Sequence, residues 1–115
     1  RARGPVQILT RQPTQGRSRA GGLRWGEMEV DCLVGHGASI LLRETIRERS
    51  DLTRVYICEE CGALAVQAQN RKLYCPICGE KARISKTVVS YAFKLLVQEL
   101  MSMCIFPRIK LEGII

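Results

Sequence analysis

Apolar side chains recur at helical intervals in two parts of this 115-residue chain, residues 27–49 and residues 90–103. In each part the spacing predicts one apolar stripe along a helix. The stripes consist of Val34, Ala38, Leu41 and Thr45, and of Phe93, Leu96, Val97, Leu100 and Cys104. Gly35 and Gly37 weaken the first helix near its middle, so we expect a break there. Ser90 can cap the second helix, and Pro107 should end it.

Four short runs between the helices have the composition of β-strands. They are residues 55–57, 63–68, 72–74 and 83–89, and Asn70 and Arg71 form the expected turn between the second and third runs. Residues 6–10 could form one more strand within an N-terminal segment whose glycines and prolines disfavour a continuous helix. The predicted fold class is α+β, with an extended basic arm, a long broken helix, a ribbon of short antiparallel strands and a C-terminal helix.

Cysteines mark the ribbon as a candidate metal site. Cys58 and Cys61 form one Cys-x-x-Cys pair, and Cys75 and Cys78 form a second. A short loop lets both thiolates of a pair face one ion, and two pairs complete a tetrahedron. Iron also accepts four thiolates, but the short connection between the pairs favours one structural zinc ion. Four protein ligands leave no open position for water or substrate, so we expect no catalysis at this metal.

The other two cysteines, Cys32 and Cys104, are expected to be small buried apolar residues. The paired spacing of the other four favours a reducing compartment over a secreted, disulfide-bonded protein. No apolar run approaches the roughly 20 residues needed to span a bilayer, so no membrane association is expected. The chain begins with Arg1 rather than methionine, which suggests a piece of a longer polypeptide.

Positive charge is concentrated at the start of the chain. The formal net charge is +7, and residues 1–24 contain six arginines and no acidic residue. These arginines are Arg1, Arg3, Arg11, Arg17, Arg19 and Arg24. The planar guanidinium can pair with a phosphate through two hydrogen bonds, so the expected partner is a polyanion. The eleven acidic residues are scattered, and no aspartate-rich motif for magnesium-dependent phosphoryl transfer occurs.

Two stretches of sequence are more specific than their composition. Residues 3–29 contain Arg-Gly-Pro, Thr-Arg-Gln-Pro-Thr, Gly-Arg-Ser-Arg and Gly-Gly-Leu-Arg-Trp-Gly-Glu-Met-Glu, and residues 90–100 read Ser-Tyr-Ala-Phe-Lys-Leu-Leu-Val-Gln-Glu-Leu. Together with the cysteine pairs between them, they closely resemble the C-terminal region of the second-largest subunit of archaeal and eukaryotic DNA-directed RNA polymerases. Trp25 departs from that pattern, because phenylalanine is usual there.

The resemblance implies a segment of the polymerase clamp that packs against the largest subunit and lies next to the RNA–DNA hybrid. Residues 1–31 match an arginine-rich switch loop, followed by a helix and connector (32–54), the zinc ribbon (55–89) and the C-terminal helix and tail (90–115). The positions implied to approach the hybrid or the template backbone are Arg11, Gln12, Arg17, Arg19 and Arg24. Glu27 and Glu29 match acidic positions that anchor the loop to neighbouring elements.

The resemblance also implies that this chain is part of a nucleotidyltransferase without holding its catalytic centre, since the catalytic magnesium belongs to the largest subunit. The implied location is the cytoplasm for an archaeal protein and the nucleus for a eukaryotic one; residues 6–9 and 100–103 look more archaeal. Two alternatives stay open. One is a free-standing zinc ribbon that binds nucleic acid through the basic arm, and the other is a thiol redox or zinc-sensor protein.

Overall fold

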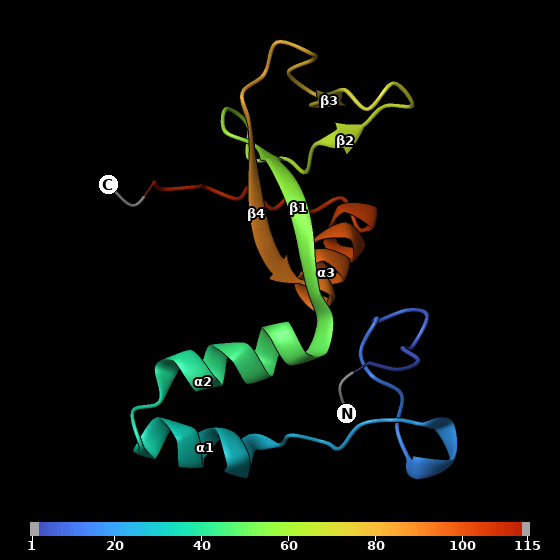
Figure 1. Cartoon of the computed structure of the whole chain (residues 1–115). Coiled ribbons are helices and arrows are strands. Elements are labelled where there is room, and N and C mark those ends of the chain that lie inside the picture. Colours follow the sequence, from blue (N-terminus) through green and yellow to red (C-terminus); the bar gives the residue numbers. More distant parts are fainter. Residues whose placement is uncertain (1–2, 114–115) are drawn as a thin grey trace. The chain divides into compact units, whose positions relative to one another are not determined.

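The computed structural model describes residues 3–113 of a chain that divides into two compact units (Figure 1). The first unit comprises Arg1–Leu52 and Ser90–Ala92, and the second comprises Thr53–Val89 and Phe93–Ile115. Residues 1, 2, 114 and 115 lie outside the described residues, and so does Arg1 of the predicted basic arm.

The first unit begins with a loop closed by hydrogen bonds. The predicted strand at residues 6–10 is wrong, because only Val6 pairs, with Pro13, and residues 8–10 form a turn. The Gln7 N–H donates to the Gln12 carbonyl at 2.8 Å, and the Thr10 hydroxyl donates to the Gln7 side-chain oxygen at 2.9 Å. These local bonds fold the basic arm back on itself instead of leaving it straight.

The helical part of the first unit is interrupted, as the two glycines predicted. Its pieces are α1 (Glu27–Gly35), α2 (Ser39–Arg43) and a π-helical segment, η2 (Glu44–Asp51). Gly37 lies between α1 and α2 with a φ of 68°, a left-handed conformation that favours glycine. At the start of α1 the Glu29 carboxylate accepts the Gly26 N–H at 3.1 Å. Glu29 thus caps its own helix within this chain.

The second unit contains a two-stranded sheet and a small hairpin. The strands are β1 (Leu52–Cys58), β2 (Val66–Gln67), β3 (Leu73–Tyr74) and β4 (Ile84–Ser90), paired as β1 with β4 and as β2 with β3. In Figure 1, β1 and β4 run in opposite directions. The β2–β3 pair is antiparallel, with Val66 opposite Tyr74. Its turn contains Arg71 at a φ of 63°, and the Asn70 side chain accepts the Lys72 N–H, so the predicted turn is confirmed.

Helix α3 (Tyr91–Ser102) is bounded by contacts that the sequence did not reveal. At its start, the Asp51 carboxylate accepts the Ala92 N–H at 3.0 Å. Ser90, the last residue of β4, directly precedes the helix, at the position where the cap was predicted. At its end, Cys104 adopts a φ of 63° and the Ile105 N–H bonds to the Leu100 carbonyl at 2.9 Å. This arrangement is a Schellman-type ending, so the helix stops before Pro107 can stop it.

Buried apolar residues are few and lie only in the second unit among the residues described. They are Val55, Ile57, Cys58, Ala63, Cys75 and Val97. Cys32 and Cys104 are both exposed, so their predicted burial is wrong: no other part of residues 3–113 covers them. Within residues 3–113, no helix is both long enough and apolar enough to cross a membrane. The α+β class is confirmed, but the core is small.

Asp51 provides a test of how α3 is stabilised. Its side chain is 5% exposed, so the hydrogen bond to Ala92 is shielded from water. We expect Asp51→Ala to lower the free energy of unfolding of the zinc-loaded chain by about 1 to 2 kcal/mol, the usual loss for a helix cap. Asp51→Asn retains an acceptor oxygen and should lose much less. Equal losses in denaturant titrations of the two variants would contradict the cap.

Candidate metal centre and nucleic-acid interface

Each cysteine pair lies on a turn that directs two sulfurs to the same side. Cys58 ends β1 and Cys75 follows β3 directly. In the first turn the Gly62 N–H bonds to the Cys58 carbonyl at 3.0 Å, and in the second the Gly79 N–H bonds to the Cys75 carbonyl at 2.8 Å. The two glycines have φ values of 73° and 84°, where a side chain would be strained.

The four predicted cysteines come together. The Sγ atoms of Cys58, Cys61, Cys75 and Cys78 all lie within 4.8 Å of one another. The Cys61 and Cys75 sulfurs are 3.3 Å apart, far longer than the roughly 2.05 Å of a disulfide. Tetrahedral zinc–sulfur bonds of about 2.3 Å place the sulfurs about 3.8 Å apart. The donor set and its spacing therefore fit a structural zinc ion in a ribbon.

The four sulfurs change one another's tendency to ionise. Burial raises the pKa of Cys75, but N–H groups of Cys78 and Ile77 directed at its sulfur outweigh burial and hold the pKa at about 7. One of these bonds, from the Cys78 N–H to the Cys75 Sγ, is 3.4 Å long. Hydrogen bonding with Cys61 and burial raise the pKa of Cys78 to about 12. Four adjacent thiolates repel one another, and a divalent ion offsets that repulsion.

Two contacts around the first knuckle, the turn from Cys58 to Gly62, were not predicted from the sequence. The Glu59 carboxylate accepts a hydrogen bond from the Ser85 hydroxyl and lies 3.8 Å from the Arg83 guanidinium. Alternation in an extended chain places residues 83 and 85 on one face, which could have suggested a shared partner. The C-terminal segment also returns to the metal site, where the Ile109 N–H bonds to the Gly62 carbonyl at 3.0 Å. No periodicity in the sequence indicates that second contact.

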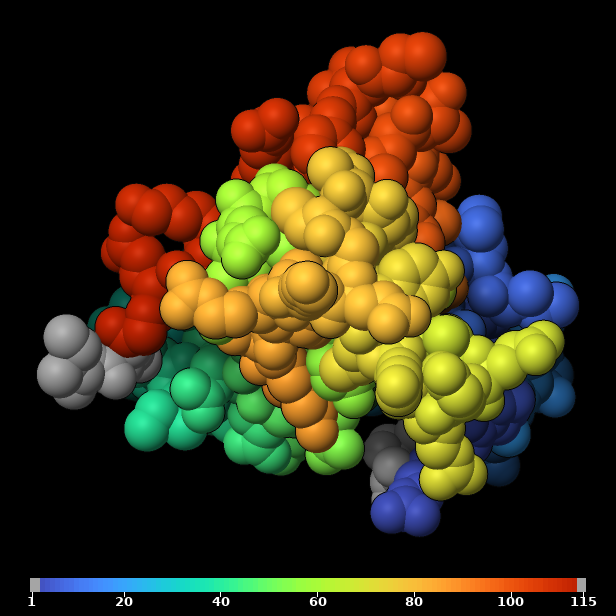
Figure 2. Space-filling model, turned by 90° about the horizontal axis from the view of Figure 1, so that it is seen from above, coloured from blue at the N-terminus to red at the C-terminus, as the bar shows by residue number. Residues whose placement is uncertain are grey.

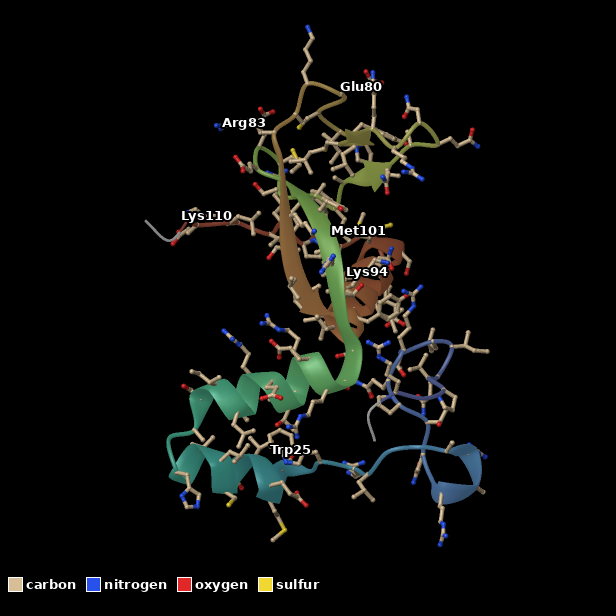
Figure 3. All side chains as sticks on the ribbon, viewed as in Figure 1. Trp25, Glu80, Arg83, Lys94, Met101 and Lys110 are labelled. Atoms are coloured by element: carbon tan, nitrogen blue, oxygen red, sulfur yellow. The ribbon has the colours of Figure 1, made fainter. Side chains whose placement is uncertain are left out.

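Loops form one end of the second unit (Figure 2). The turn between β2 and β3 (yellow) and the segment after the second cysteine pair (orange) face the viewer. Figure 3 shows Glu80 and Arg83 on the second of these loops. The buried cluster beneath contains only Cys58, Ala63 and Cys75, with Cys61 and Ala82 packed against it. A core of this size is too small to hold the ribbon by itself, and a metal bound at the four sulfurs would supply a further restraint.

Arg17 and Arg19 lie on a one-turn helix, η1 (Arg17–Arg19), in the first unit, and both are exposed. The Gly21 N–H closes this turn by bonding to the Gly16 carbonyl at 2.9 Å. A Cβ atom at Gly21 would overlap the Thr14 carbonyl oxygen, so the loop has no space for a side chain there. The glycines thus give the two arginines a defined, protruding turn.

A cleft of about 560 Å³ lies beside this loop within the first unit. Among the predicted residues it brings together Gln12 and Arg24, whereas Arg17 and Arg19 are not in its lining. Trp25 lines the cleft as well, and Figure 3 shows its side chain near α1 and α2. Arg49, from η2, is a further basic residue of the cleft. Arg49 was not among the candidates identified from the sequence.

The remaining predicted residue, Arg11, contacts an aromatic ring. Its guanidinium carbon lies 4.2 Å from the centroid of the Tyr91 ring. Among residues 3–113, Arg11, Arg17, Arg19 and Arg24 form no ion pair with a carboxylate. By contrast, arginines outside this segment do so: Arg43, Arg47, Arg49 and Arg83. The predicted group is therefore available for an external anion.

Zinc content provides the direct test of the metal centre. We expect one zinc per chain, lost on substitution of Cys58 or Cys75 by Ser and retained when Cys32 or Cys104 becomes Ser. Affinity should fall as the pH is lowered, since protons compete for the thiolates. Elemental analysis gives the stoichiometry, and circular dichroism after chelation should show loss of strand structure. Zinc retained by the Cys75→Ser variant would exclude a four-cysteine site.

Gly62 and Gly79, the glycines that follow the two cysteine pairs, should differ in how much a substitution by alanine destabilises the chain. A left-handed residue with a side chain costs about 1 to 2 kcal/mol at either position. A Cβ at Gly62 would also approach the Ile109 nitrogen to 2.8 Å, whereas a Cβ at Gly79 would meet nothing within 4 Å. Gly62→Ala should therefore lower the melting temperature of the zinc-loaded chain more than Gly79→Ala does. Equal shifts would show that the Ile109 contact contributes nothing to stability.

Comparison with known proteins shows to which family this chain belongs. Residues 21–112 match the family model described as RNA polymerase Rpb2, domain 7. The chain is 58% identical over 113 residues to the DNA-directed RNA polymerase subunit Rpo2 of Saccharolobus solfataricus, covering 97% of this chain and 10% of that protein. It is 54% identical over 110 residues to the DNA-directed RNA polymerase II subunit RPB2 of Schizosaccharomyces pombe, covering 95% and 9%.

A similar match is found with the RPB2 subunit of Encephalitozoon cuniculi, at 53% identity over 112 residues, 97% of this chain and 10% of the relative. The chain thus spans about a tenth of the length of the curated relatives it matches. The resemblance drawn from the arginine loop, the cysteine pairs and the last helix is confirmed. The chain belongs to the family RNA polymerase Rpb2, domain 7, and this domain is a region of the second-largest subunit of RNA polymerase.

Proposed function

We propose that this chain is the C-terminal clamp segment of the second-largest subunit of a DNA-directed RNA polymerase. In this role the arginine segment contacts the backbone of the RNA–DNA hybrid or of the template, and the ribbon holds one structural zinc ion. The observation that carries the proposal is that Arg17, Arg19 and Arg24 have no carboxylate partner among the described residues of a chain from this family.

Arginine on a glycine-shaped loop suits this task chemically. Phosphate contacts fix the position of a nucleic acid without reading its sequence. A transcribing enzyme must accept every template, so contacts of this kind are appropriate. The cleft beside the loop adds Gln12 and Arg49, whose side chains can donate hydrogen bonds to phosphate or sugar oxygens.

Uncovered apolar side chains support the proposed packing against other subunits, the largest subunit first among them. In the first unit, Ile8 is 99% exposed, Leu23 102% and Met28 82%. In α3, Phe93 and Leu96 remain 43% and 50% exposed although Val97, on the same stripe, is buried. Large apolar side chains left exposed to this extent in each unit favour contacts with other chains over a finished monomer.

Catalysis is proposed to take place on another subunit. Within residues 3–113 the only group of three or more side chains able to hold a metal is the four-cysteine cluster. The magnesium of nucleotidyl transfer would then be bound by carboxylates elsewhere in the assembly. Because archaeal Rpo2 subunits match this chain at 56% to 58% identity, we favour the archaeal alternative and its cytoplasmic location.

A chimeric polymerase tests the arginine contacts. This chain would replace the matching region of Rpo2 in the Saccharolobus solfataricus enzyme, and the retention of an RNA–DNA hybrid would be measured against salt concentration. We expect Arg17→Ala, Arg19→Ala and Arg24→Ala each to weaken retention and to lower the slope of log affinity against log salt by about 1.

Arg83→Ala serves as the matched control, because Arg83 is also exposed but faces Glu59 in the ribbon. It should leave the salt slope unchanged. If the three loop variants behave like this control in an assembled enzyme, the arginine segment does not bind the nucleic acid backbone. If the unsubstituted chimera retains nucleic acid but recruits no other subunit, a free-standing zinc-ribbon binder becomes the better description.

A further inference from the structure

We infer that Tyr91 is a positioning residue: its ring holds the Arg11 guanidinium in place for a backbone phosphate. The inference rests on the proposed function, because it specifies how one arginine of the segment is prepared for its ligand. It assigns a task to the first residue of α3, far from the arginine loop in sequence. Arg11 and Tyr91 both belong to the first unit.

The backbone at Arg11 is fixed from both sides. The Arg11 N–H donates to the Gln7 carbonyl at 3.1 Å, and the Gln7 N–H donates to the Gln12 carbonyl at 2.8 Å. Arg11 adopts a φ of 54°, a left-handed conformation that residues with a side chain rarely take. The turn thereby gives the Arg11 side chain a direction that an ordinary extended segment would not provide.

The contact with Tyr91 then fixes the end of the side chain. The guanidinium carbon lies over the ring at 4.2 Å from its centroid, well inside the range of a cation–π interaction. Such a contact occupies the face of the ring and uses none of the N–H groups of the arginine. Among the described residues the Arg11 side chain makes no hydrogen bond, so these donors remain for a phosphate.

The ring itself is held by the start of its helix. Tyr91 is the first residue of α3, and the next residue, Ala92, donates its N–H to the Asp51 carboxylate at 3.0 Å. Asp51 is almost fully buried, which protects this bond from water. A flexible arginine pays an entropic cost when it binds, and a ring anchored in this way lowers that cost. Tyr91 therefore acts through Arg11 and need not touch the nucleic acid.

The test compares two kinds of substitution in the chimeric polymerase. Tyr91→Phe keeps the ring, while Tyr91→Leu and Tyr91→Met replace it with apolar side chains without one. We expect the Leu and Met variants to weaken hybrid retention about two- to fivefold, the size of one cation–π contact at a partly exposed site. Tyr91→Phe should retain the unsubstituted affinity. Zinc content and subunit composition verify that each variant is assembled.

A double-substitution cycle separates positioning from mere stabilisation of the helix. In an Arg11→Ala background, Tyr91→Leu should cause no further loss of retention, because there is no guanidinium left to position. If Tyr91→Leu weakens retention equally in both backgrounds, or if Tyr91→Phe is as weak as Tyr91→Leu, the inference is overturned. The same holds if the Arg11 and Tyr91 variants are neutral while the Arg17, Arg19 and Arg24 variants weaken retention; if all are neutral, the proposed function fails with it.

Discussion

The requirement that four sulfurs share one small space governs the second unit. The chain at each cysteine pair must turn back within four residues. This requires a glycine in the left-handed conformation after each pair, and it determines where β1 and β3 end. The strands themselves bury too few side chains to hold this arrangement. Thiolates brought this close repel one another, and a cation bound at the four sulfurs would offset that repulsion and stabilise the ribbon. In that role the metal would replace part of the missing core.

The first unit follows a different principle. Of the residues described there, only Asp51 is buried, and it is polar. Its loop is ordered by backbone hydrogen bonds, such as those closing at Gly16 and Thr14, and its helices leave apolar side chains uncovered. A segment built in this way has a local shape but little hydrophobic stabilisation of its own. Its composition is suited to a surface that other chains complete.

Periodicity and spacing predicted the elements whose causes are local. The glycine break between α1 and α2, the turn at Asn70 and Arg71, and the four clustered cysteines all follow from neighbouring residues. Contacts between distant positions were inaccessible: neither Asp51 with Ala92 nor Arg11 with Tyr91 leaves a periodic trace. Burial of Cys32 and Cys104 was predicted from residue type, which cannot tell whether the covering surface belongs to the same chain.

The contact between Ile109 and Gly62 has a mechanical consequence. Tension applied to the chain beyond Ile109 would act first on the carbonyl of Gly62, one residue after a cysteine of the metal cluster. The load would then pass into the loop between Cys58 and Gly62 before it reaches the end of α3. A fusion or tether attached behind this point would therefore pull on the zinc ribbon rather than on a free end.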